Sequence, residues 1–288
     1  MGRNGGIASP LRNLSLRPEN SETRIIWAHV PAGPFIYGPE EVYERLEGTR
    51  PPRPQITIDL PAFDIARRPV TYAEWKAFLD ETGFAWPGNW WAVCADWRRR
   101  FKVVPEYPPE MADHPIVDVS HADALAYCVW FSGESGQRVT LPTEEQWEKA
   151  ARGTDGRTYP WGENPPRPEL LWQRKFPVGP ETYLFSLLRG PQRELARCGW
   201  YWRNGFPLSI GSLSENVSPY GCLDMAGNIW EWTVSHYHPD VPDFHVVKGG
   251  SWGYSVHHTR CYVRSACSIE IPSRDYRAQG TGFRIIAE

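Results

Sequence analysis

The segment YGCLDMAGNIWEWT, residues 220–233, carries the pattern that most constrains the fold of this 288-residue chain. It runs from a glycine turn into residues 229–234, a short strand-like run. Trp230 and Trp232 within that run, together with Trp147 upstream, can each remove a large apolar area from water. The chain has 15 Trp and 28 Pro but few long helical patterns, so its short elements need such anchors. We therefore expect a loop-rich body built around these tryptophans.

Short strand-like runs lie on both sides of this segment. Residues 55–60 show the clearest pattern, because Ile56, Ile58 and Leu60 alternate with polar residues as in a half-buried strand. The other predicted strands are two within residues 27–38 around the turn at 31–33, followed by 63–65, 246–248, 260–263 and 282–286.

Three helices are predicted from pairs of polar residues three apart, which cap a helix N-terminus by bonding its free backbone N–H groups. The pairs are Thr71 with Glu74, Ser120 with Asp123, and Thr143 with Gln146, and the glycines that predict the helix ends are Gly83, Gly133 and Gly153. In the second helix an apolar stripe recurs with helical spacing, and we expect it to face the core: Ala122, Leu125, Ala126 and Val129.

The bulk properties exclude several classes of protein. A net charge of -3 gives no basic footprint for nucleic acid or for an anionic membrane surface. No apolar run approaches the length of about 18 residues that a membrane span needs. Residues 1–24 are polar and lack the pattern of a secretory signal, so we expect a flexible lead-in followed by one domain over residues 25–288.

The six cysteines are scattered and form no CxxC pair. Without an export signal, such thiols are expected to stay reduced and to pack as small apolar residues. This makes a cytoplasmic location the default expectation. The chain has 26 Arg against five Lys, a bias that with the high Pro content suits a thermophile or a high-GC genome alike.

Four segments together resemble the formylglycine-generating-enzyme (sulfatase-modifying factor) domain. They are PVTYAEW at 69–75, HPIVDVS at 114–120 leading on to LPTEEQWEKAARG at 141–153, the segment at 220–233, and GGSW at 249–252 closed by TGFR at 281–284. Their order covers roughly residues 27–288. The resemblance implies an α+β, C-type-lectin-like fold with small twisted antiparallel sheets, two main helices and much irregular chain. It also implies that Arg284 pairs internally.

The oxidases of this family bind copper through two cysteines shortly after the GGS turn. Counted without gaps, those two positions hold Tyr254 and Thr259 here, and neither side chain supplies the thiolate that copper(I) requires. Cys261 and Cys267 lie nearby but at a different spacing. We therefore expect no catalytic residues, with an oxidase of the formylglycine-generating type as the alternative.

Two kinds of metal site remain to be considered. His236 and His238, with His245, suggest metal ligands only weakly, and solvent-facing histidines are the expected interpretation. The family resemblance implies a possible calcium ion held by oxygen atoms around Asn228, Ile229, Trp230 and Glu231. Hydrogen bonding of Asn228 and Glu231 within the turn is an equal alternative. Apart from this possible calcium ion, no cofactor is expected.

Non-enzymatic relatives use this fold to display side chains, and the closest such group is the variable proteins of diversity-generating retroelements. Their C-terminal segment is rewritten at adenines of Asn codons, which never yields Trp, Met, Lys, Gln or Glu. Of the 29 residues from 253 to 281 here, only Glu270 and Gln279 belong to that excluded set. The deficit agrees with diversification but is small.

We therefore predict a display protein that binds a macromolecule, most simply a protein, through residues 253–281. An undiversified binding or regulatory domain of the same family is the other non-enzymatic interpretation. Tyr and His are efficient contact residues because they offer large amphipathic area with few rotatable bonds. The predicted ligand-binding residues are Tyr254, His257, His258, Tyr262, Ile269, Ile271, Asp275 and Tyr276, with Trp90, Trp91 and Trp97 bordering them.

Overall fold

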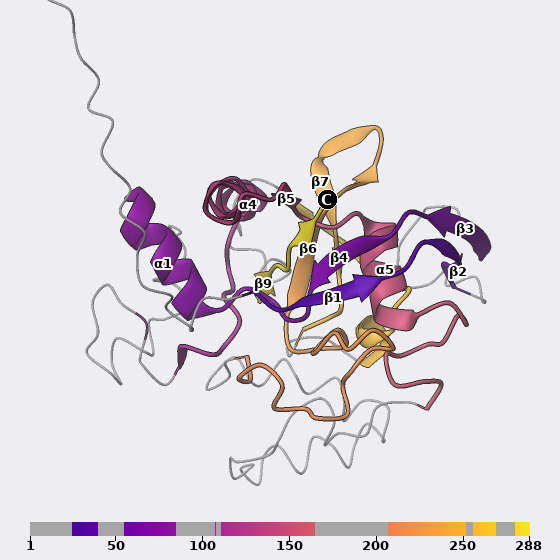
Figure 1. Cartoon of the computed structure of the whole chain (residues 1–288). Helices are drawn as coiled ribbons and strands as arrows, with labels where there is room; N and C mark the ends of the chain where they lie inside the picture. The colour runs from indigo at the N-terminus through magenta and orange to yellow at the C-terminus, as the bar shows by residue number, and fades with distance from the viewer. Residues whose placement is uncertain are drawn as a thin grey trace, which may run out of the picture.

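The structure is a computed structural model that describes residues 25–39, 55–84, 107, 111–164, 207–251, 256–268 and 280–288. Figure 1 shows the helices placed around short strands, with long stretches of irregular chain between them. Three α-helices are described: α1 (Tyr72–Thr82), α4 (His121–Ser135) and α5 (Glu144–Arg152). A short 3₁₀ helix, η3 (Val256–Thr259), follows near the C-terminal end.

One four-stranded sheet joins the two ends of the described chain. Its strand order is β1-β4-β10-β5, and all its pairings are antiparallel. The strands are β1 (Trp27–Val30), β4 (Phe63–Ala66), β10 (Ile286–Ala287) and β5 (Val139–Thr140). The strands β2 (Gly33–Tyr37) and β3 (Ile56–Leu60) form a separate antiparallel pair. On β3, Ile56 is exposed, so this strand is less covered than its alternating pattern predicts.

The second four-stranded sheet contains Trp230 and Trp232. Its order is β8-β7-β6-β9, formed by β6 (Trp230–His238), β7 (Val241–Lys248), β8 (Arg264–Ser268) and β9 (Thr281–Gly282). β6 pairs with β9 in parallel, the exception among otherwise antiparallel pairings in the described chain. The strand predicted at residues 260–263 lies a few residues further on, in β8, because residues 256–263 form η3 and a turn.

All three helices begin where the capping pairs predict. Thr71, Ser120 and Thr143 are the N-caps. In each case the N-cap side chain accepts the backbone N–H of its partner, and the partner's side chain accepts the backbone N–H of the N-cap. The predicted ends at Gly83 and Gly153 are confirmed. The predicted end of α4 at Gly133 is wrong, since the helix continues to Gly136, whose left-handed backbone (φ 69°) closes it.

The buried face of α4 is also different from the predicted stripe. Ala122 and Val129 are exposed, and Leu125 and Ala126 are only partly buried. The buried residues are instead His121, Ala124, Tyr127 and Cys128. Tyr127 packs among Trp75, Phe78 and Phe283, so a large aromatic ring decides which face turns inward.

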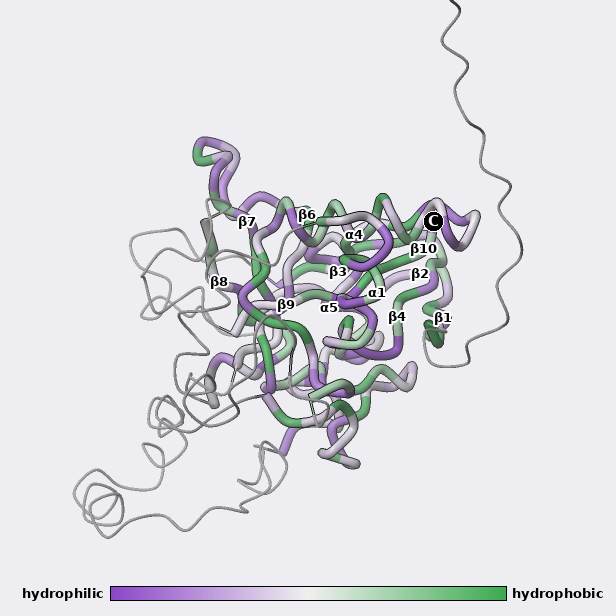
Figure 2. The backbone as a smooth tube through the Cα atoms, turned by 90° about the vertical axis from the view of Figure 1, so that its left-hand side faces the viewer, coloured by the Kyte–Doolittle hydropathy of each residue, from purple (hydrophilic) through white to green (hydrophobic). Residues whose placement is uncertain are grey.

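The core consists of two clusters of buried apolar side chains. One surrounds Trp75, Tyr127, Trp230 and Trp232, and the other surrounds Trp147. The three tryptophans expected as anchors are therefore buried. Figure 2 shows hydrophobic stretches running along the strands and helices in the interior of the described chain. No helix among the described residues has the length and apolar character that crossing a membrane requires.

A buried ion pair holds the C-terminal strand region to β6. Arg284, fully buried, donates from Nε and Nη2 to the two carboxylate oxygens of Glu231 at 2.6 and 2.7 Å. The same guanidinium donates to the carbonyls of Leu223 and Ala66, and Trp147 donates its indole N–H to Glu231 at 2.7 Å. The internal pairing expected of Arg284 is confirmed.

Replacing Arg284 by Met is expected to destabilise the protein strongly. The change leaves the Glu231 carboxylate buried without its counterion, a loss of about 3–5 kcal/mol in the free energy of unfolding. Urea unfolding measures it. Arg138→Met is the matched control, because Arg138 is 81% exposed in its pair with Glu288 and its loss costs at most about 1 kcal/mol. Equal losses in the two variants would contradict the central role of the buried pair.

Candidate ligand-binding face

The turn at Gly249 and Gly250 fixes the start of the predicted binding segment. Both glycines have left-handed backbone (φ 94° and 74°), and Gly227 donates its N–H to the carbonyl of Gly249 at 2.7 Å. A Cβ atom on Gly250 would lie 2.8 Å from the carbonyl oxygen of His258. The turn therefore packs directly against η3, with no room for a side chain between them.

Residues 258–262 alternate between the core and the surface. Thr259 and Cys261 are 1% and 0% exposed, while His258, Arg260 and Tyr262 between them are half-buried. The backbone N–H of Cys261 donates to the carbonyl of Thr158 at 2.9 Å, which ties the segment to a neighbouring loop. This short stretch is thus anchored by every second residue and presents the others.

The neighbouring loop at residues 153–164 adds aromatic residues beside Tyr262. Tyr159 and Trp161 stack with their ring centroids 5.2 Å apart. Burial raises the pKa of Tyr159 to about 12, and the nearby Tyr262 and Cys261 add to that rise. The guanidinium of Arg152 lies 5.4 Å from the centre of the Tyr262 ring, a cation–π contact. Tyr262 is therefore held between this loop and the end of α5.

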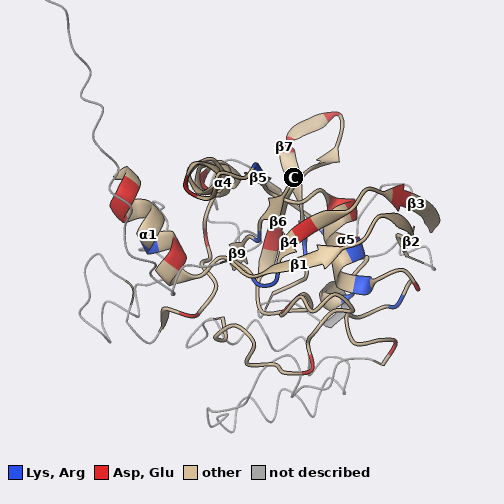
Figure 3. Ribbon diagram, in the orientation of Figure 1, with Lys and Arg blue, Asp and Glu red and all other residues tan. Residues whose placement is uncertain are grey.

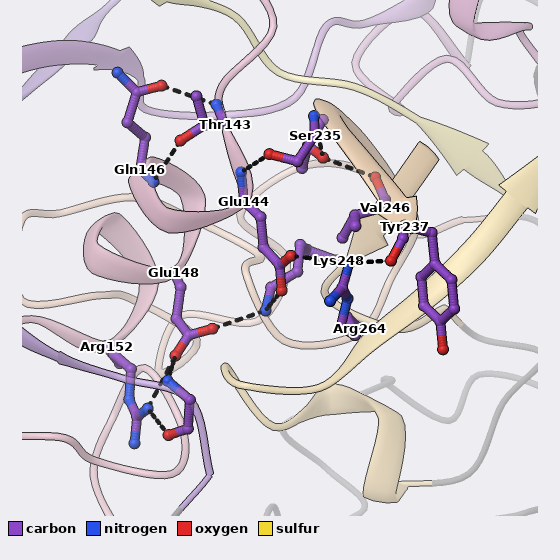
Figure 4. A network of polar contacts seen from close by, with 12 residues as sticks. Thr143, Glu144, Gln146, Glu148, Arg152, Ser235, Tyr237, Val246, Lys248 and Arg264 are labelled. Atoms are coloured by element: carbon purple, nitrogen blue, oxygen red, sulfur yellow. Dashed lines mark hydrogen bonds and ion pairs between the residues drawn. The ribbon is translucent and has the colours of Figure 1, made fainter. Parts of the chain in front are cut away.

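A buried charge network joins α5 to β7, the strand that precedes this segment (Figure 4). Glu148 on α5 accepts from Lys248 at 2.9 Å, from Arg152 at 3.0 Å and from the backbone N–H of Gly38 at 2.7 Å. Glu148, Lys248 and Arg152 are each at most 1% exposed. Besides Glu148, α5 carries Glu144 and Glu145 in its first turn and the basic Lys149 and Arg152 in its last turn (Figure 3), an arrangement that suits the helix dipole.

The same network reaches β8 through Arg264. Its guanidinium lies 3.3 Å from the Glu144 carboxylate, and Glu144 lies 3.7 Å from Lys248. Arg264 also donates to the carbonyl of Tyr237 at 3.0 Å and lies 4.6 Å from the centre of the Tyr237 ring (Figure 4). β8 is therefore fixed to both α5 and β6 by one arginine.

Two of the predicted ligand-binding residues can be placed with their side chains, His258 and Tyr262. His258 is half-buried and meets the Trp230 ring edge-on at 5.9 Å between centroids. His257 lies in η3, but its side chain is outside the described part of the structure. The remaining predicted residues lie outside the described residues: Tyr254, Ile269, Ile271, Asp275 and Tyr276, and likewise Trp90, Trp91 and Trp97.

The supporting ion network was not anticipated from the sequence. Glu144, Glu148 and Arg152 follow one another at intervals of four on α5, a spacing that normally marks a solvated helix face. The available signal was that Trp147 lies within the same turn, so at least part of that face had to be buried. The cations on β7 and β8 that neutralise it come from residues about 100 positions away.

The model of the Sulfatase-modifying factor enzyme 1-like domain matches residues 13–288. The chain belongs to this family. It is 33% identical over 296 residues to the inactive C-alpha-formylglycine-generating enzyme 2 of Mus musculus, covering 89% of this chain and 83% of that protein. It is 29% identical over 322 residues to the formylglycine-generating enzyme of Mycobacterium tuberculosis, covering 90% and 96%. The family therefore includes both active enzymes and inactive homologues.

Other similarities are more distant or cover less of the relative. The hercynine oxygenase of Mycolicibacterium smegmatis is 31% identical over 275 residues, which cover 82% of this chain and 55% of that protein. Treponema denticola variable protein 1 superposes with a TM-score of 0.58 at 17% identity, covering 91% of this chain and 94% of that one. PvdO from Pseudomonas aeruginosa gives 0.57 at 21% identity, with coverages of 90% and 93%. These structures confirm the predicted α+β, C-type-lectin-like fold of the formylglycine-generating type.

At the two positions where the family's oxidases carry copper-binding cysteines, the described chain has one residue to examine. Thr259 is buried and supplies a hydroxyl, while Tyr254 lies outside the described residues. Cys261 and Cys267 are free thiols packed in different core clusters. Burial raises the pKa of Cys261 to about 12, which keeps it protonated at neutral pH.

The side-chain oxygens proposed for calcium are already engaged within the protein. Asn228 Oδ1 accepts the N–H of Leu208 at 2.9 Å, and both carboxylate oxygens of Glu231 accept from Arg284. Ile229 and Trp230 are buried beside them. As arranged, this set does not fit a calcium ion, because Arg284 already neutralises its one carboxylate. Calcium binding stays a prediction that only a binding measurement can test.

The histidine expectation needs correction in one respect. His245 is buried rather than solvent-facing, because its ring stacks on His121 of α4 with centroids 3.8 Å apart. His236 is exposed and packs on the other side of His245 at 4.5 Å. Among the described residues, no group of three or more His, Cys, Asp or Glu side chains is arranged to hold a metal ion.

Gly250→Ala is expected to destabilise the protein by about 1–3 kcal/mol, because the new methyl meets the His258 carbonyl at 2.8 Å in a left-handed backbone. Gly133→Ala is the control: it lies within α4 with nothing within 4 Å and should stabilise by about 0.5–1 kcal/mol. Thermal and urea unfolding measure both. A neutral Gly250→Ala change would mean that the turn does not press on η3.

Cys261 is expected to resist alkylation in the native protein. Iodoacetamide at pH 8 reacts with thiolates, and a buried thiol with a pKa near 12 offers almost none. Mass spectrometry of protein treated before and after denaturation measures the modified fraction at this residue. Rapid labelling of native Cys261 would contradict the buried, anchoring role given to it here.

Proposed function

We propose that this protein is a non-catalytic member of its family that binds a macromolecular ligand through the segment at residues 253–281. The observation that carries the proposal is the alternation at residues 258–262, where buried Thr259 and Cys261 anchor the backbone and the residues between them reach the surface. A backbone held in this way can present side chains of many kinds. It also avoids the cost of ordering a flexible loop when the ligand binds.

The absence of a catalytic thiol pair supports a binding role. Tyr254 and Thr259 occupy the positions of the copper-binding cysteines, and Cys261 is too deeply buried and too weakly acidic to replace them. The similarity to an inactive formylglycine-generating enzyme over 89% of this chain agrees with this interpretation. The competing function is an oxidase of the formylglycine-generating type, which the similarity to the M. tuberculosis enzyme favours.

We extend the binding face beyond residues 253–281 to the loop at 153–164. Trp161 and Tyr220 are half-buried, and Tyr220 lies near the paired Asp155 and Arg157 of that loop. Cys261 is tied to the same loop by its bond to Thr158. Trp, Tyr and Arg are the residue types that dominate the energy of protein–protein contacts. A protein is therefore the class of ligand that this face fits best.

Diversification by a retroelement is the finer form of the proposal. Its support is the shortage of Trp, Met, Lys, Gln and Glu among residues 253–281, and a fold shared with a variable protein of Treponema denticola. The test is genomic. A neighbouring reverse transcriptase gene and a near-identical template repeat, with adenines wherever this segment varies, would support it, and a locus without them would exclude it.

The display role can be tested without knowing the ligand. In a library randomised together at Tyr254, His258, Tyr262 and Tyr276, we expect most variants to fold with a melting temperature within a few degrees of the parent, because the proposal assigns the anchoring of the segment to the buried Thr259 and Cys261 and not to these side chains. A matched library randomised at the anchors Thr259 and Cys261 should mostly fail to fold, since both side chains are buried. Differential scanning fluorimetry of single clones measures each library.

Two outcomes would count against the proposal. If the first library fails to fold as often as the second, the predicted contact residues belong to the core. If the purified protein binds copper(I) through two thiols and consumes oxygen in the presence of a cysteine-containing peptide, the oxidase function is correct instead. Neither measurement requires a known partner.

A further inference from the structure

Two histidines of the second sheet and one of α4 form a continuous stack of rings. His121 begins α4, His245 lies on β7 and His236 lies on β6. The ring centroids of His121 and His245 are 3.8 Å apart with their planes at 25°, and those of His245 and His236 are 4.5 Å apart at 39°. The edge of the Trp232 ring system closes the inner end of the stack at 5.4 Å from His121.

One nitrogen of each ring meets a backbone carbonyl, so each ring is held in place by a hydrogen bond that it donates. His121 Nε2 lies 3.0 Å from the carbonyl of Thr233, and His245 Nδ1 lies 3.1 Å from that of Val234. His236 Nδ1 lies 3.2 Å from the carbonyl of Pro242. These contacts account for one proton on each imidazole. A second proton would make a ring cationic against its neighbour.

The charged groups around the stack offer little to neutralise such a cation. From β8, Arg264 brings a further positive charge, donating to the carbonyls of His236 and Tyr237. Most carboxylates of the surrounding elements are bound to other partners: Asp123 to Ser120, Glu144 to Arg264 and Lys248, Glu148 to Lys248, and Glu231 to Arg284. The other two, Asp240 and Asp243, are exposed near the hairpin tip, where Asp240 lies beside His238.

The stack lies directly behind the described part of the binding segment. His245 pairs in register with Cys267 of β8, and Phe244 pairs with Ser268. The β6–β7 pairing is irregular at this place, with register shifts on both sides of His236. A change in the stack therefore acts on a hairpin whose β6–β7 hydrogen bonding is already irregular. Its strand β7 pairs with β8 over the whole length of β8.

We propose that the stack of His121, His245 and His236 is a proton-sensitive latch, which opens the β6–β7 hairpin and loosens β8 when the rings are protonated. The latch rests on the proposed binding function only for its consequence, which is weaker ligand binding at acidic pH. Its physical basis is electrostatic repulsion. Two protonated imidazole rings whose centroids lie 3.8–4.5 Å apart in a partly buried site repel each other and are driven apart.

The direction of the pH effect follows from the two buried rings. Burial, then the charge of His245, lowers the pKa of His121 to about 4 from 6.5, and burial with the charge of His236 lowers that of His245. The folded hairpin therefore binds fewer protons than the opened one. Its stability is complete above pH 6.5 and falls as the pH drops toward 4.

Amide hydrogen exchange of the full chain at pH 7.5 and pH 5 tests the latch, after correction for the intrinsic exchange rates. His121 alone, with pKa values of about 4 closed and 6.5 open, increases the opening equilibrium of residues 230–248 about 30-fold at pH 5. Residues 264–267 should accelerate with them. His121→Phe keeps an aromatic ring in the stack but cannot take a proton, and should remove most of the acceleration.

His245→Phe is the second variant in case His121→Phe does not fold, and His29→Phe is the control, because His29 is exposed and pairs with Asp64 away from the stack. The control should retain the full acceleration. Equal pH responses in His121→Phe, His245→Phe and His29→Phe would overturn the latch, and so would opening of 230–248 with no change at 264–267. The readout needs no ligand, so a failure of the latch is distinct from a failure of the binding function.

Discussion

The buried pair of Arg284 and Glu231 is the interaction on which the rest of the structure depends. This chain has few long helices or strands to pack against one another. Its elements are therefore also joined by buried polar contacts, which are strong only if every buried polar group has a partner. Arg284 joins β6 to the carbonyls of Ala66 and Leu223, while Trp147 adds α5 to the same carboxylate. Two sheets and a helix thus share one point of attachment close to the C-terminus.

A second network extends this framework to the surface. Glu148 and Lys248 connect α5 with β7, Arg152 continues the connection to the ring of Tyr262, and Arg264 attaches β8 to Glu144. The proposed binding face therefore lies at the outer end of a chain of buried charges that begins in the core. In its described part, the segment is held by the buried side chains of Thr259 and Cys261 and by the backbone bond of Cys261 to Thr158.

Local signals in the sequence predicted the start of every described α-helix, because a capping pair is complete within four residues. The end of α4 and its buried face were not predictable in the same way. An apolar stripe shows which residues tolerate burial, but the packing of Tyr127 against Trp75 and Phe283 decides which are buried. The same limit applies to the site: the charges of α5 resemble a solvated face until Lys248 and Arg264 are placed beside them. The stack of His121 on His245 joins residues more than 100 positions apart and leaves no local pattern.

Hydroxyl-radical footprinting of the native protein measures whether the segment presents its side chains to solvent, since it compares tyrosines of equal intrinsic reactivity within one molecule. The account predicts rapid oxidation of Tyr262, which is half-buried on the face, and strong protection of Tyr127 and Tyr159, which are 1% and 3% exposed. Protection of Tyr262 equal to that of Tyr127 would contradict it, because the segment would then pack into the core instead of presenting its side chains to a ligand.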